Sequence, residues 1–423
     1  MSEKKHKERR RRERAKKEEP KVNKIGDVKM AYIMYGKKVF IIPIVIAIIL
    51  GAIIWGIMYN ARKDNEPQET ADNQKEQINY IWGEIKPGKR NTNNFTTVRS
   101  SDGVDVPVPT GYTASSASDE NSVRGGFVIY EGTEAVTDSN KWNAQCNRNQ
   151  YVWIPIANVS DMYWRDQTTG KKYGTRYTFS SSAYTKDATK KYEPQTTKYD
   201  IQSTYLTTYL NGMSREDLLM EMEIDFDKML NSVATYGGFY IGRYETGDLS
   251  QATPVVKRIN TDLGNQTWWQ MWKKAKKLTG TSAGVQMIWG IQWDETLKWL
   301  IDTGEKTYAE IASDSTSWGN YWNNRFTYYT NTSKSTETKP LRSSTKIPAG
   351  AYEGTNTNNI YDLAGNVYDW TMESNGLDND KFRYNCGGCY GDHGDMYPAM
   401  YRYYYNPYDK YEYVGLRCSL FIK

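Results

Sequence analysis

The stretch "NIYDLAGNVYDW", from Asn359 to Trp370, places a Gly-Asn turn directly before a run of aromatic and apolar residues. Two further glycine-containing stretches follow it, "CGGCY" at 386–390 and "VGLRC" at 414–418. A fourth stretch, "GGFYIGRYETG" at 237–247, is bounded by glycines and predicts a strand over Phe239–Glu245. "YVWIPI" at 151–156 predicts another short strand. Short strands with many turn residues between them favour an α+β fold with much irregular chain.

Three segments show helical periodicity. Ser214 can cap the first helix, whose apolar face is expected to hold Leu218, Met222, Phe226 and Met229. Thr267 is the predicted N-cap of the second helix, which Gly280 ends. The third helix is predicted over 293–304, with Asp294 near its start. Trp299 and Leu300 of this helix are expected in the core.

Taken together, these stretches resemble the formylglycine-generating enzyme (sulfatase-modifying factor) family, a branch of the C-type-lectin-like fold. "GGFYIGRYETG" is similar to the opening strand of that family, and "NIYDLAGNVYDW" is similar to its N-x-x-D-x-x-GNVWEW signature. "CGGCY…VGLRC" is similar to its closing RGGSW…GFR pattern. The resemblance covers about residues 125–423 and implies that the chain carries one domain of this type.

The catalytic cysteines of the family have no counterpart in this sequence. The resembling enzymes that oxidise a substrate cysteine share two cysteines shortly after a GGS motif. In those enzymes this pair of thiols binds copper and activates oxygen. Counted from Gly387, the first falls at Asp392 and the second falls among residues 395–400, which contain no cysteine. Cys389 stands in place of the serine. The sequence therefore favours a non-catalytic protein, and an oxidoreductase of altered chemistry is the alternative.

The cysteines suggest other chemistry only weakly. Cys386-x-x-Cys389 could be a redox pair, but such a pair works at a helix N-terminus, and "YGDHGDMYP" cannot form that helix. Cys386, Cys389, His393 and Cys418 are ligand types for zinc, yet nothing specifies how they would combine. We favour a disulfide or isolated thiols; with Cys146, four cysteines allow three full connectivities.

The turn of the signature stretch is a candidate calcium site. Relatives with this fold often hold calcium there through backbone carbonyls, an asparagine and an acidic side chain, so the resemblance implies Asn366 and Asp369 as oxygen donors. The alternative is a turn asparagine and a surface aspartate without a metal. No cofactor other than calcium is indicated.

Tyrosine is concentrated near the end of the chain, where 10 of the 30 residues from Tyr384 to Tyr413 are tyrosine. Tyrosine presents a large, rigid contact surface at low entropic cost, which is why antibody paratopes use it heavily. In "YRYYYNPYDKYEY" both faces of any strand carry tyrosine, so about half must be exposed. We predict a ligand-binding surface within 384–413 that is formed by Tyr384, Asn385, Cys389, His393, Asp395, Tyr397, Met400, Tyr403, Tyr405, Asn406, Tyr408 and Asp409.

The predicted surface also has a codon pattern. Codons for Asn, Tyr, Asp, His, Cys, Ser and Gly can all be reached from AAC by changing adenines only. Every residue of the predicted surface except Met400 belongs to that set, and the neighbouring Lys410 does not belong to it either. The pattern resembles the variable proteins of diversity-generating retroelements, which display randomised residues at the C-terminal end of this same fold.

The basic residues are concentrated in the first 38 residues, which carry 15 Lys/Arg and 6 Asp/Glu; the rest of the chain has a net charge of −4. The next stretch, "VFIIPIVIAIILGAIIWGIMY", has 21 residues without a charge, enough to span the roughly 30 Å hydrocarbon core of a membrane. Since positive residues stay on the cytoplasmic side, we expect the domain outside the cell. No nucleic-acid partner is expected for the external domain.

The predicted organisation has four parts. Residues 1–38 form a basic cytoplasmic tail and 39–59 a transmembrane helix, so the protein is a single-pass protein of the plasma membrane. Residues 60–103 are polar and turn-rich and are predicted to be a flexible spacer. Residues 104–423 form the external domain, in which 157–210 is a Ser/Thr/Tyr-rich insertion whose secondary structure the sequence does not decide.

Three functions remain open from the sequence. The first is an externally displayed protein whose C-terminal surface binds a protein or a glycan. The second is an oxidoreductase of the formylglycine-generating type or a relative with altered chemistry. The third is a structural envelope protein whose domain only packs against its neighbours.

Overall fold

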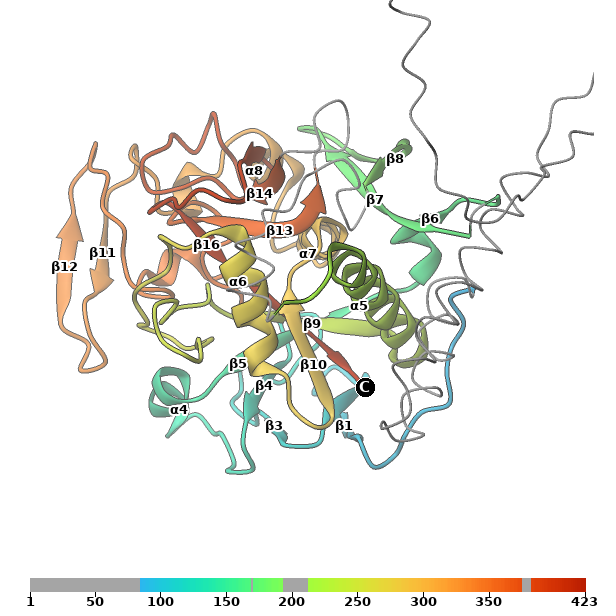
Figure 1. Ribbon diagram of the computed structural model, residues 1–423. Coiled ribbons are helices and arrows are strands. Elements are labelled where there is room, and N and C mark those ends of the chain that lie inside the picture. The colour runs from blue at the N-terminus through green and yellow to red at the C-terminus, as the bar shows by residue number, and fades with distance from the viewer. Residues whose placement is uncertain (1–83, 169, 193–211, 375–381) are drawn as a thin grey trace, which may run out of the picture. The chain divides into compact units, whose positions relative to one another are not determined.

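Two β-sheets organise the protein, for which we obtained a computed structural model (Figure 1). The structure describes residues 84–168, 170–192, 212–374 and 382–423. All of these belong to one unit, Ala71–Lys423. The predicted transmembrane segment at 39–59 lies outside the described residues. Within the described ranges, no helix is both long enough and apolar enough to cross a membrane.

The larger sheet has six strands in the order β10-β17-β9-β5-β4-β3, and every neighbouring pair is antiparallel. Its strands are β3 (Tyr112–Ala114), β4 (Val128–Glu131), β5 (Gln150–Pro155), β9 (Gly238–Gly242), β10 (Ala283–Met287) and β17 (Cys418–Ile422). The strand predicted over Phe239–Glu245 is β9, which begins one residue earlier and ends at Gly242. The predicted "YVWIPI" strand is β5.

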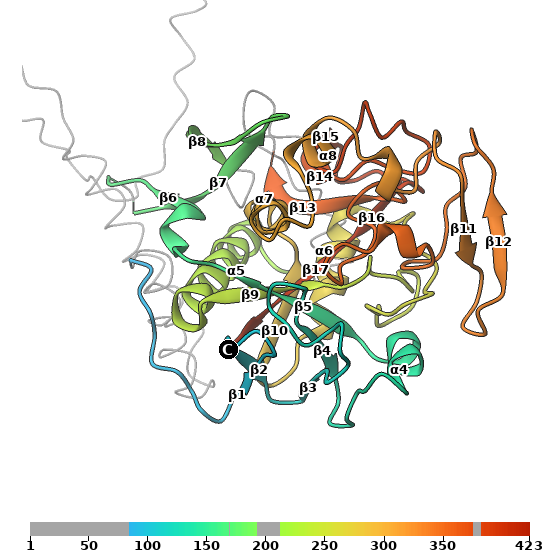
Figure 2. The same cartoon turned by 180° about the vertical axis from the view of Figure 1, so that it is seen from behind.

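The smaller sheet has four strands in the order β15-β14-β13-β16, with β15 at one edge (Figure 2). Its strands are β13 (Tyr368–Ser374), β14 (Arg383–Cys386), β15 (Arg402–Tyr405) and β16 (Val414–Leu416). The pairs β13–β14 and β14–β15 are antiparallel, whereas β13–β16 is parallel. All residues of β13 and β14 are buried, but β15 is partly exposed.

Three smaller sheets complete the β-structure. They contain β1 (Phe95–Arg99) with β2 (Asp105–Pro109), β6 (Tyr163–Arg165) with β7 (Lys172–Phe179) and β8 (Tyr184–Tyr192), and β11 (Phe326–Tyr329) with β12 (Thr336–Lys339). β1 corrects the predicted spacer, because residues 95–99 pair with β2 instead of forming a free linker. The region 157–210, whose secondary structure the sequence does not decide, contains β6, β7 and β8 in its described part.

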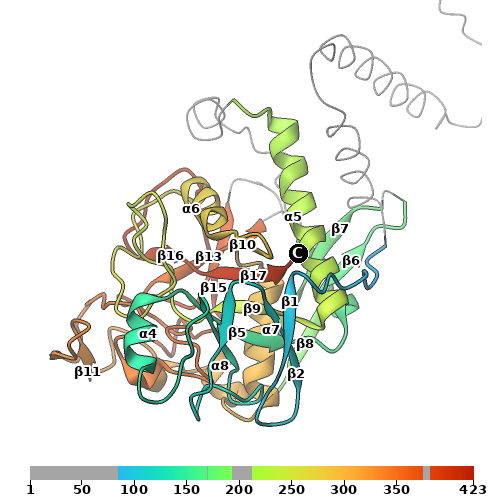
Figure 3. The same ribbon diagram turned by 90° about the horizontal axis from the view of Figure 1, so that it is seen from below.

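Five α-helices and four short 3-10 helices occur in the described residues. The α-helices are α4 (Lys141–Asn147), α5 (Arg215–Tyr236), α6 (Trp268–Ala275), α7 (Gly290–Asp302) and α8 (Tyr308–Ala312). The 3-10 helices are η1 (Val159–Asp161), η3 (Lys276–Leu278), η4 (Thr316–Trp318) and η5 (Glu353–Thr355). α5 packs on β9 and β17 of the larger sheet, as Figure 3 shows from below. This mixture of helices and antiparallel sheets confirms the α+β prediction.

The predicted caps of α5 and α6 are confirmed. The Ser214 hydroxyl accepts a hydrogen bond from the backbone of Asp217, and the four apolar residues predicted for the inner face of α5 are all buried. Thr267 and Gln270 form a reciprocal capping box at the start of α6. A left-handed Gly237 ends α5, at φ 84°.

The third helix begins earlier than predicted. α7 starts at Gly290, where the Gln292 side chain accepts a hydrogen bond from the backbone of Trp289. Asp294 therefore lies inside the helix and is fully buried, as Trp299 and Leu300 are. A Cβ atom at Gly290 would lie 1.8 Å from a carboxylate oxygen of Glu373, so this close approach requires glycine.

Arg402 fixes β15 to the rest of the domain. Its buried guanidinium pairs with Asp294 of α7 at 2.8 Å and with Glu373 of β13 at 3.1 Å. It also donates to the Gly290 carbonyl. Burial raises the pKa of Glu373, an effect that the positive charge of Arg402 opposes. The strand that carries the tyrosine-rich sequence is thus held by a fully desolvated ion pair.

We predict that Arg402→Met lowers the free energy of unfolding by about 3–5 kcal/mol, because it leaves two buried carboxylates without their cation. Urea denaturation of the full chain, followed by tryptophan fluorescence, measures the change. Arg99→Met is the matched control, since Arg99 forms an exposed pair with Asp105. Equal midpoints for the two variants would show that Arg402 does not hold β15.

Candidate functional site

The candidate site is built on the edge strand β15 and on the loops at its two ends. In the register of the smaller sheet, Tyr403 lies opposite Asn385 and Tyr404 lies opposite Tyr384. β14, which is central, separates β15 from β13. β15 therefore has a neighbouring strand of its own sheet on one side only.

The loop that leads into β15 is fixed at its base. Gly387 and Gly388 both have positive φ, and a Cβ at Gly388 would lie 2.6 Å from the Tyr397 carbonyl oxygen. The buried Tyr321 hydroxyl lies 2.9 Å from the carbonyl oxygens of both Gly387 and Tyr397 and can donate to either. The loop from 388 to 397 is consequently closed by one side chain from a distant part of the sequence.

Seven tyrosine rings form a continuous series of contacts across β15 and its flanking loops. We call this set the tyrosine surface: it comprises Tyr397, Tyr401, Tyr403, Tyr404, Tyr405, Tyr411 and Tyr413. The closest ring centroids are those of Tyr405 and Tyr411, at 4.5 Å. Such spacings are typical of favourable aromatic pairs, so the rings support one another.

The tyrosine surface is open to solvent at its centre. Tyr403 and Tyr404 are 38% and 44% exposed, and the other five residues are half-buried. Burial, and then the carboxylate of Asp409, raise the pKa of Tyr411 to about 12, so its phenol remains neutral at physiological pH. Neutral phenols with exposed ring faces offer apolar contact and hydrogen bonds, which suits binding better than acid–base catalysis.

The structure separates the twelve residues predicted for ligand binding by depth. Three are exposed: Asp395, Tyr403 and Asp409. Six are half-buried: His393, Tyr397, Met400, Tyr405, Asn406 and Tyr408. The remaining three are buried: Tyr384, Asn385 and Cys389. The buried three cannot contact a ligand in this conformation, which corrects their predicted role.

Asn385 is buried on β14, which lies between β13 and β15, and it is opposite Trp370 on one side and Tyr403 on the other. Its amide nitrogen and oxygen have no hydrogen-bond partner among the described residues. Cys389 is buried beside Asp392, whose carboxylate accepts a hydrogen bond from the Cys389 backbone. Residue type alone does not reveal this difference in depth, because asparagine occurs both at the buried position 385 and at the half-buried position 406.

Sequence reasoning also missed several members of the site. The predicted set lacks four tyrosines of the tyrosine surface, namely Tyr401, Tyr404, Tyr411 and Tyr413. The presence of tyrosine on both faces of this stretch could have indicated them. Met396 is 62% exposed and was also missed. These residues make the contact surface more apolar than the predicted set.

His393 contacts an aromatic ring and a carboxylate. Its ring stacks on Trp322 with centroids 4.8 Å apart, and its Nδ1 lies 3.8 Å from a carboxylate oxygen of Asp395. The backbone of Trp322 donates to the Asp392 carbonyl, so the tryptophan loop and the histidine loop are joined. The pair extends the candidate surface beyond the tyrosines, and Trp322 is a further residue that the sequence did not indicate.

Most of the oxygen donors implied for calcium already have internal partners, and only Oδ1 of Asp369 is without a hydrogen bond among the described residues. The Asn366 side-chain oxygen accepts hydrogen bonds from Asn320 and from the backbone of Ile347, while its nitrogen donates to Glu245. The Asp369 carboxylate is buried and lies 2.8 Å from the Arg417 guanidinium. A buried cation at this distance disfavours a second one. These side chains therefore do not fit a calcium site, and Asp369 is not at the surface.

All four cysteines are free thiols, which decides between the two interpretations favoured from the sequence. Cys386 and Cys418 are fully buried, and Cys146 is half-buried. Burial raises the pKa of Cys418 to about 12 and also raises the pKa of Cys386 and Cys389. No cluster of three or more His, Cys, Asp or Glu suited to a metal ion occurs in the described ranges. The thiols thus do not fit the copper chemistry of the resembling enzymes.

The chain is similar to one known protein family and to two solved structures. A model described as "Sulfatase-modifying factor enzyme 1-like domain" matches residues 108–420. No curated protein matches the chain. A solved structure of CarF superposes with a TM-score of 0.28 and 16% identity, over 44% of this chain and 87% of that chain. Variable protein 1 of Treponema denticola superposes with a TM-score of 0.29 and 15% identity, over 43% of this chain and 84% of that chain.

TM-scores this low add nothing to the assignment, which depends on the family model. That model covers well over half of the chain, from the last two residues of β2 to the third residue of β17. The resemblance inferred from the signature stretches is confirmed, whereas the wider relation to C-type lectins stays a prediction. The chain belongs to the sulfatase-modifying factor enzyme 1-like domain family.

Proposed function

We propose that this chain is a non-catalytic member of its family that binds a protein or glycan ligand through the tyrosine surface. The observation that carries the proposal is the unbroken series of tyrosine ring contacts, with two exposed rings at its centre. Large, rigid aromatic side chains of this kind are typical of binding hot spots.

The chemistry of the thiols supports a binding role over an oxidase role. The oxidases that this chain resembles have two cysteines shortly after the GGS motif. Here Asp392 stands at the first of these positions, and residues 395–400, where the second would fall, contain no cysteine. The cysteine nearest to them, Cys389, is buried, and its pKa is raised by burial and by the charge of Asp392. A thiol with a raised pKa is a poor nucleophile and a poor metal ligand.

We further propose that the protein is displayed outside the cell through a transmembrane helix at 39–59. The support is the uncharged run of 21 residues behind a basic segment. We also propose that a retroelement diversifies the surface. The support is that most of the exposed and half-buried residues of 384–413 have types reachable from an AAC codon by adenine changes.

Alanine substitutions test the binding role. We predict that Tyr403→Ala and Tyr404→Ala each weaken binding by about tenfold or more, because each removes an exposed aromatic contact at the centre of the surface. The full chain is screened against arrays of surface proteins and glycans, and the affinity of each hit is then measured by biolayer interferometry.

Tyr112→Ala is the control for this screen, since Tyr112 is a half-buried tyrosine of β3 in the other sheet. Hits that bind the Tyr403 and Tyr404 variants as tightly as the unchanged chain would reject the tyrosine surface as the binding site. They would favour a structural envelope role instead.

Thiol reactivity tests the absence of oxidase chemistry. We predict that the native chain exposes at most Cys146 to a disulfide reagent, whereas all four thiols react after denaturation. We also predict no copper-dependent oxidation of a cysteine-containing peptide. Oxidation that Cys389→Ser abolishes, while Cys146→Ser preserves it, would establish the oxidoreductase alternative.

Sibling sequences test the retroelement. We predict that copies of this gene differ mainly at accessible positions, such as Asp395, Tyr403 and Asp409, and conserve the buried Asn385 and Cys389. Sequencing of the genomic neighbourhood should reveal a reverse transcriptase gene and a near-copy of the 3′ end of this gene. If both are missing, the diversification proposal fails while the binding proposal stands.

A further inference from the structure

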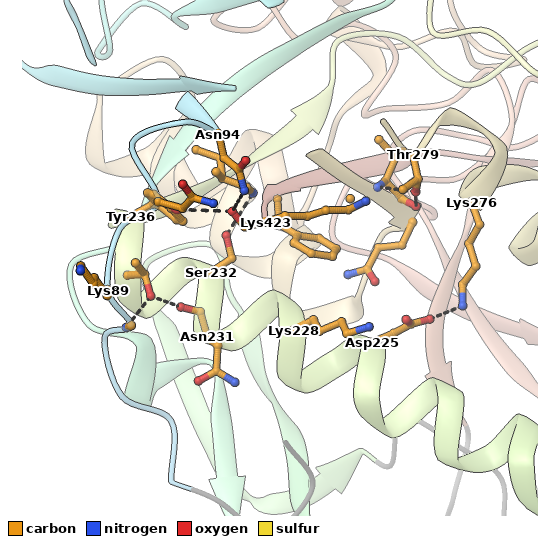
Figure 4. Close-up of a pocket in the computed structure, with 18 residues that line it drawn as sticks. Lys89, Asn94, Asp225, Lys228, Asn231, Ser232, Tyr236, Lys276, Thr279 and Lys423 are labelled. Atoms are coloured by element: carbon orange, nitrogen blue, oxygen red, sulfur yellow. Dashed lines mark hydrogen bonds and ion pairs between the residues drawn. The ribbon is translucent and has the colours of Figure 1, made fainter. Parts of the chain in front are cut away.

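Two of the cavities in the described residues lie away from the tyrosine surface, which contributes no residue to either. The larger, of about 610 Å³, is bounded by α5, β10 and β17 (Figure 4). Lys276 pairs with Asp225 there, and the Lys423 ammonium donates to the Gly280 carbonyl. These two lysines therefore do not identify a ligand. The smaller cavity, of about 350 Å³, is lined by groups of a more definite chemistry.

The smaller cavity lies between α4, η5 and the signature stretch. Residues from these elements that line it are Lys141, Trp142 and Gln145 of α4, Glu353 of η5, and Asn359 and Tyr361 of the signature stretch. Its volume is at the lower end of the range in which proteins hold small ligands, which suits a molecule of about one ring.

Two aromatic rings of this cavity are fixed between cations. The guanidinium carbons of Arg243 and Arg258 lie 5.8 Å and 5.0 Å from the ring centroid of Tyr361. The guanidinium carbon of Arg258 and the ammonium nitrogen of Lys334 lie 4.5 Å and 4.4 Å from the ring centroid of Trp142. Arg258 thus contacts both rings, and it is buried, as Arg243 and Tyr361 are. These contacts hold the walls of the cavity in place.

The charges around the cavity balance one another. Three of its cations form ion pairs, namely Arg243 with Glu120, Arg258 with Glu353, and Lys141 with Asp119. The other charged residues of the lining are one cation and one anion, Lys334 and Asp138, and both are exposed. Since no net charge is left to compensate, a neutral ligand fits this cavity best.

Two buried polar atoms of the lining residues have no hydrogen-bond partner among the described residues: Nε of Arg243 and Oδ1 of Asn356. The first is a donor and the second is an acceptor. Burying a polar atom without a partner is unfavourable, and a ligand with matching groups removes that cost. A hydroxyl group both donates and accepts, so it complements either atom.

We propose that this cavity binds a neutral, hydroxyl-rich molecule of about the size of one sugar ring, whose hydroxyl groups accept from Nε of Arg243 and donate to Oδ1 of Asn356. An apolar ligand would leave both atoms unpaired, and an anionic one would lie beside the carboxylates of the lining. The site goes beyond the proposed function and shares no residue with the tyrosine surface, so either can fail without the other.

Isothermal titration calorimetry of the full chain tests the proposal with glucose and galactose as probes. We expect saturable one-to-one binding of at least one of these sugars. The matching uronate, which carries a negative charge, and tetrahydropyran, which lacks the hydroxyl groups, should each bind at least about tenfold more weakly.

Two variants of the lining locate the site. Asn356→Leu should weaken binding of the sugar by about fivefold or more, because it removes the unpaired acceptor. Ser139→Trp should abolish binding, since a large ring at this exposed position of the lining obstructs the cavity. Asn143→Leu and Asn143→Trp are the matched controls, because Asn143 is exposed on α4 next to Trp142 but is not part of the lining. Both controls should bind as the unchanged chain does.

The proposal is overturned if neither sugar binds saturably, or if the Asn356 and Ser139 variants bind as tightly as their controls. Ser139→Trp changes only an exposed position, so its result decides if Asn356→Leu lowers the midpoint of urea unfolding. A uronate that binds more tightly than its neutral sugar would overturn the assignment of a neutral ligand.

Discussion

The buried pair of Arg417 and Asp369 is the contact on which the two sheets depend. Arg417 lies between β16 and β17 and so belongs to the point where the chain passes from the smaller sheet to the larger one. Its guanidinium pairs with Asp369 of β13 and donates to the carbonyls of Gly242, Tyr361 and Asp362. One side chain thus joins β9, the signature stretch and β13. Because all of these partners are buried, few other side chains could replace it.

Much of the fold could be predicted because its signals are local. Ser214 and Thr267 cap their helices through hydrogen bonds that span three residues, which a sequence shows directly. The start of α7 could not be found in this way, because Gly290 begins the helix where Glu373, far along the chain, leaves no space for a side chain. The segment around β1 was missed for a related reason: its strand pairs with β2 but carries mostly exposed, polar residues.

The candidate site could be predicted as a region but not residue by residue. The tyrosine-rich stretch could be found because the amino-acid composition of a segment can be read without knowledge of its tertiary packing. Depth does not follow from composition: Asn385 and Tyr403 are opposite each other in the register, yet Asn385 is buried on β14 and Tyr403 is exposed on the edge strand β15. Asp369 was expected at the surface because its partner, Arg417, is 48 residues away in sequence.

The bridging hydroxyl of Tyr321 has a consequence for how this domain can change over generations. It lies within hydrogen-bond distance of the backbone carbonyls of Gly387 and Tyr397 and can donate to either, so this contact does not depend on the side chains of the loop between them. With an anchor of this kind, backbone atoms determine the course of the loop and side chains determine what its surface can bind. Substitutions in the loop can therefore change its surface chemistry while this anchor to the rest of the domain is kept.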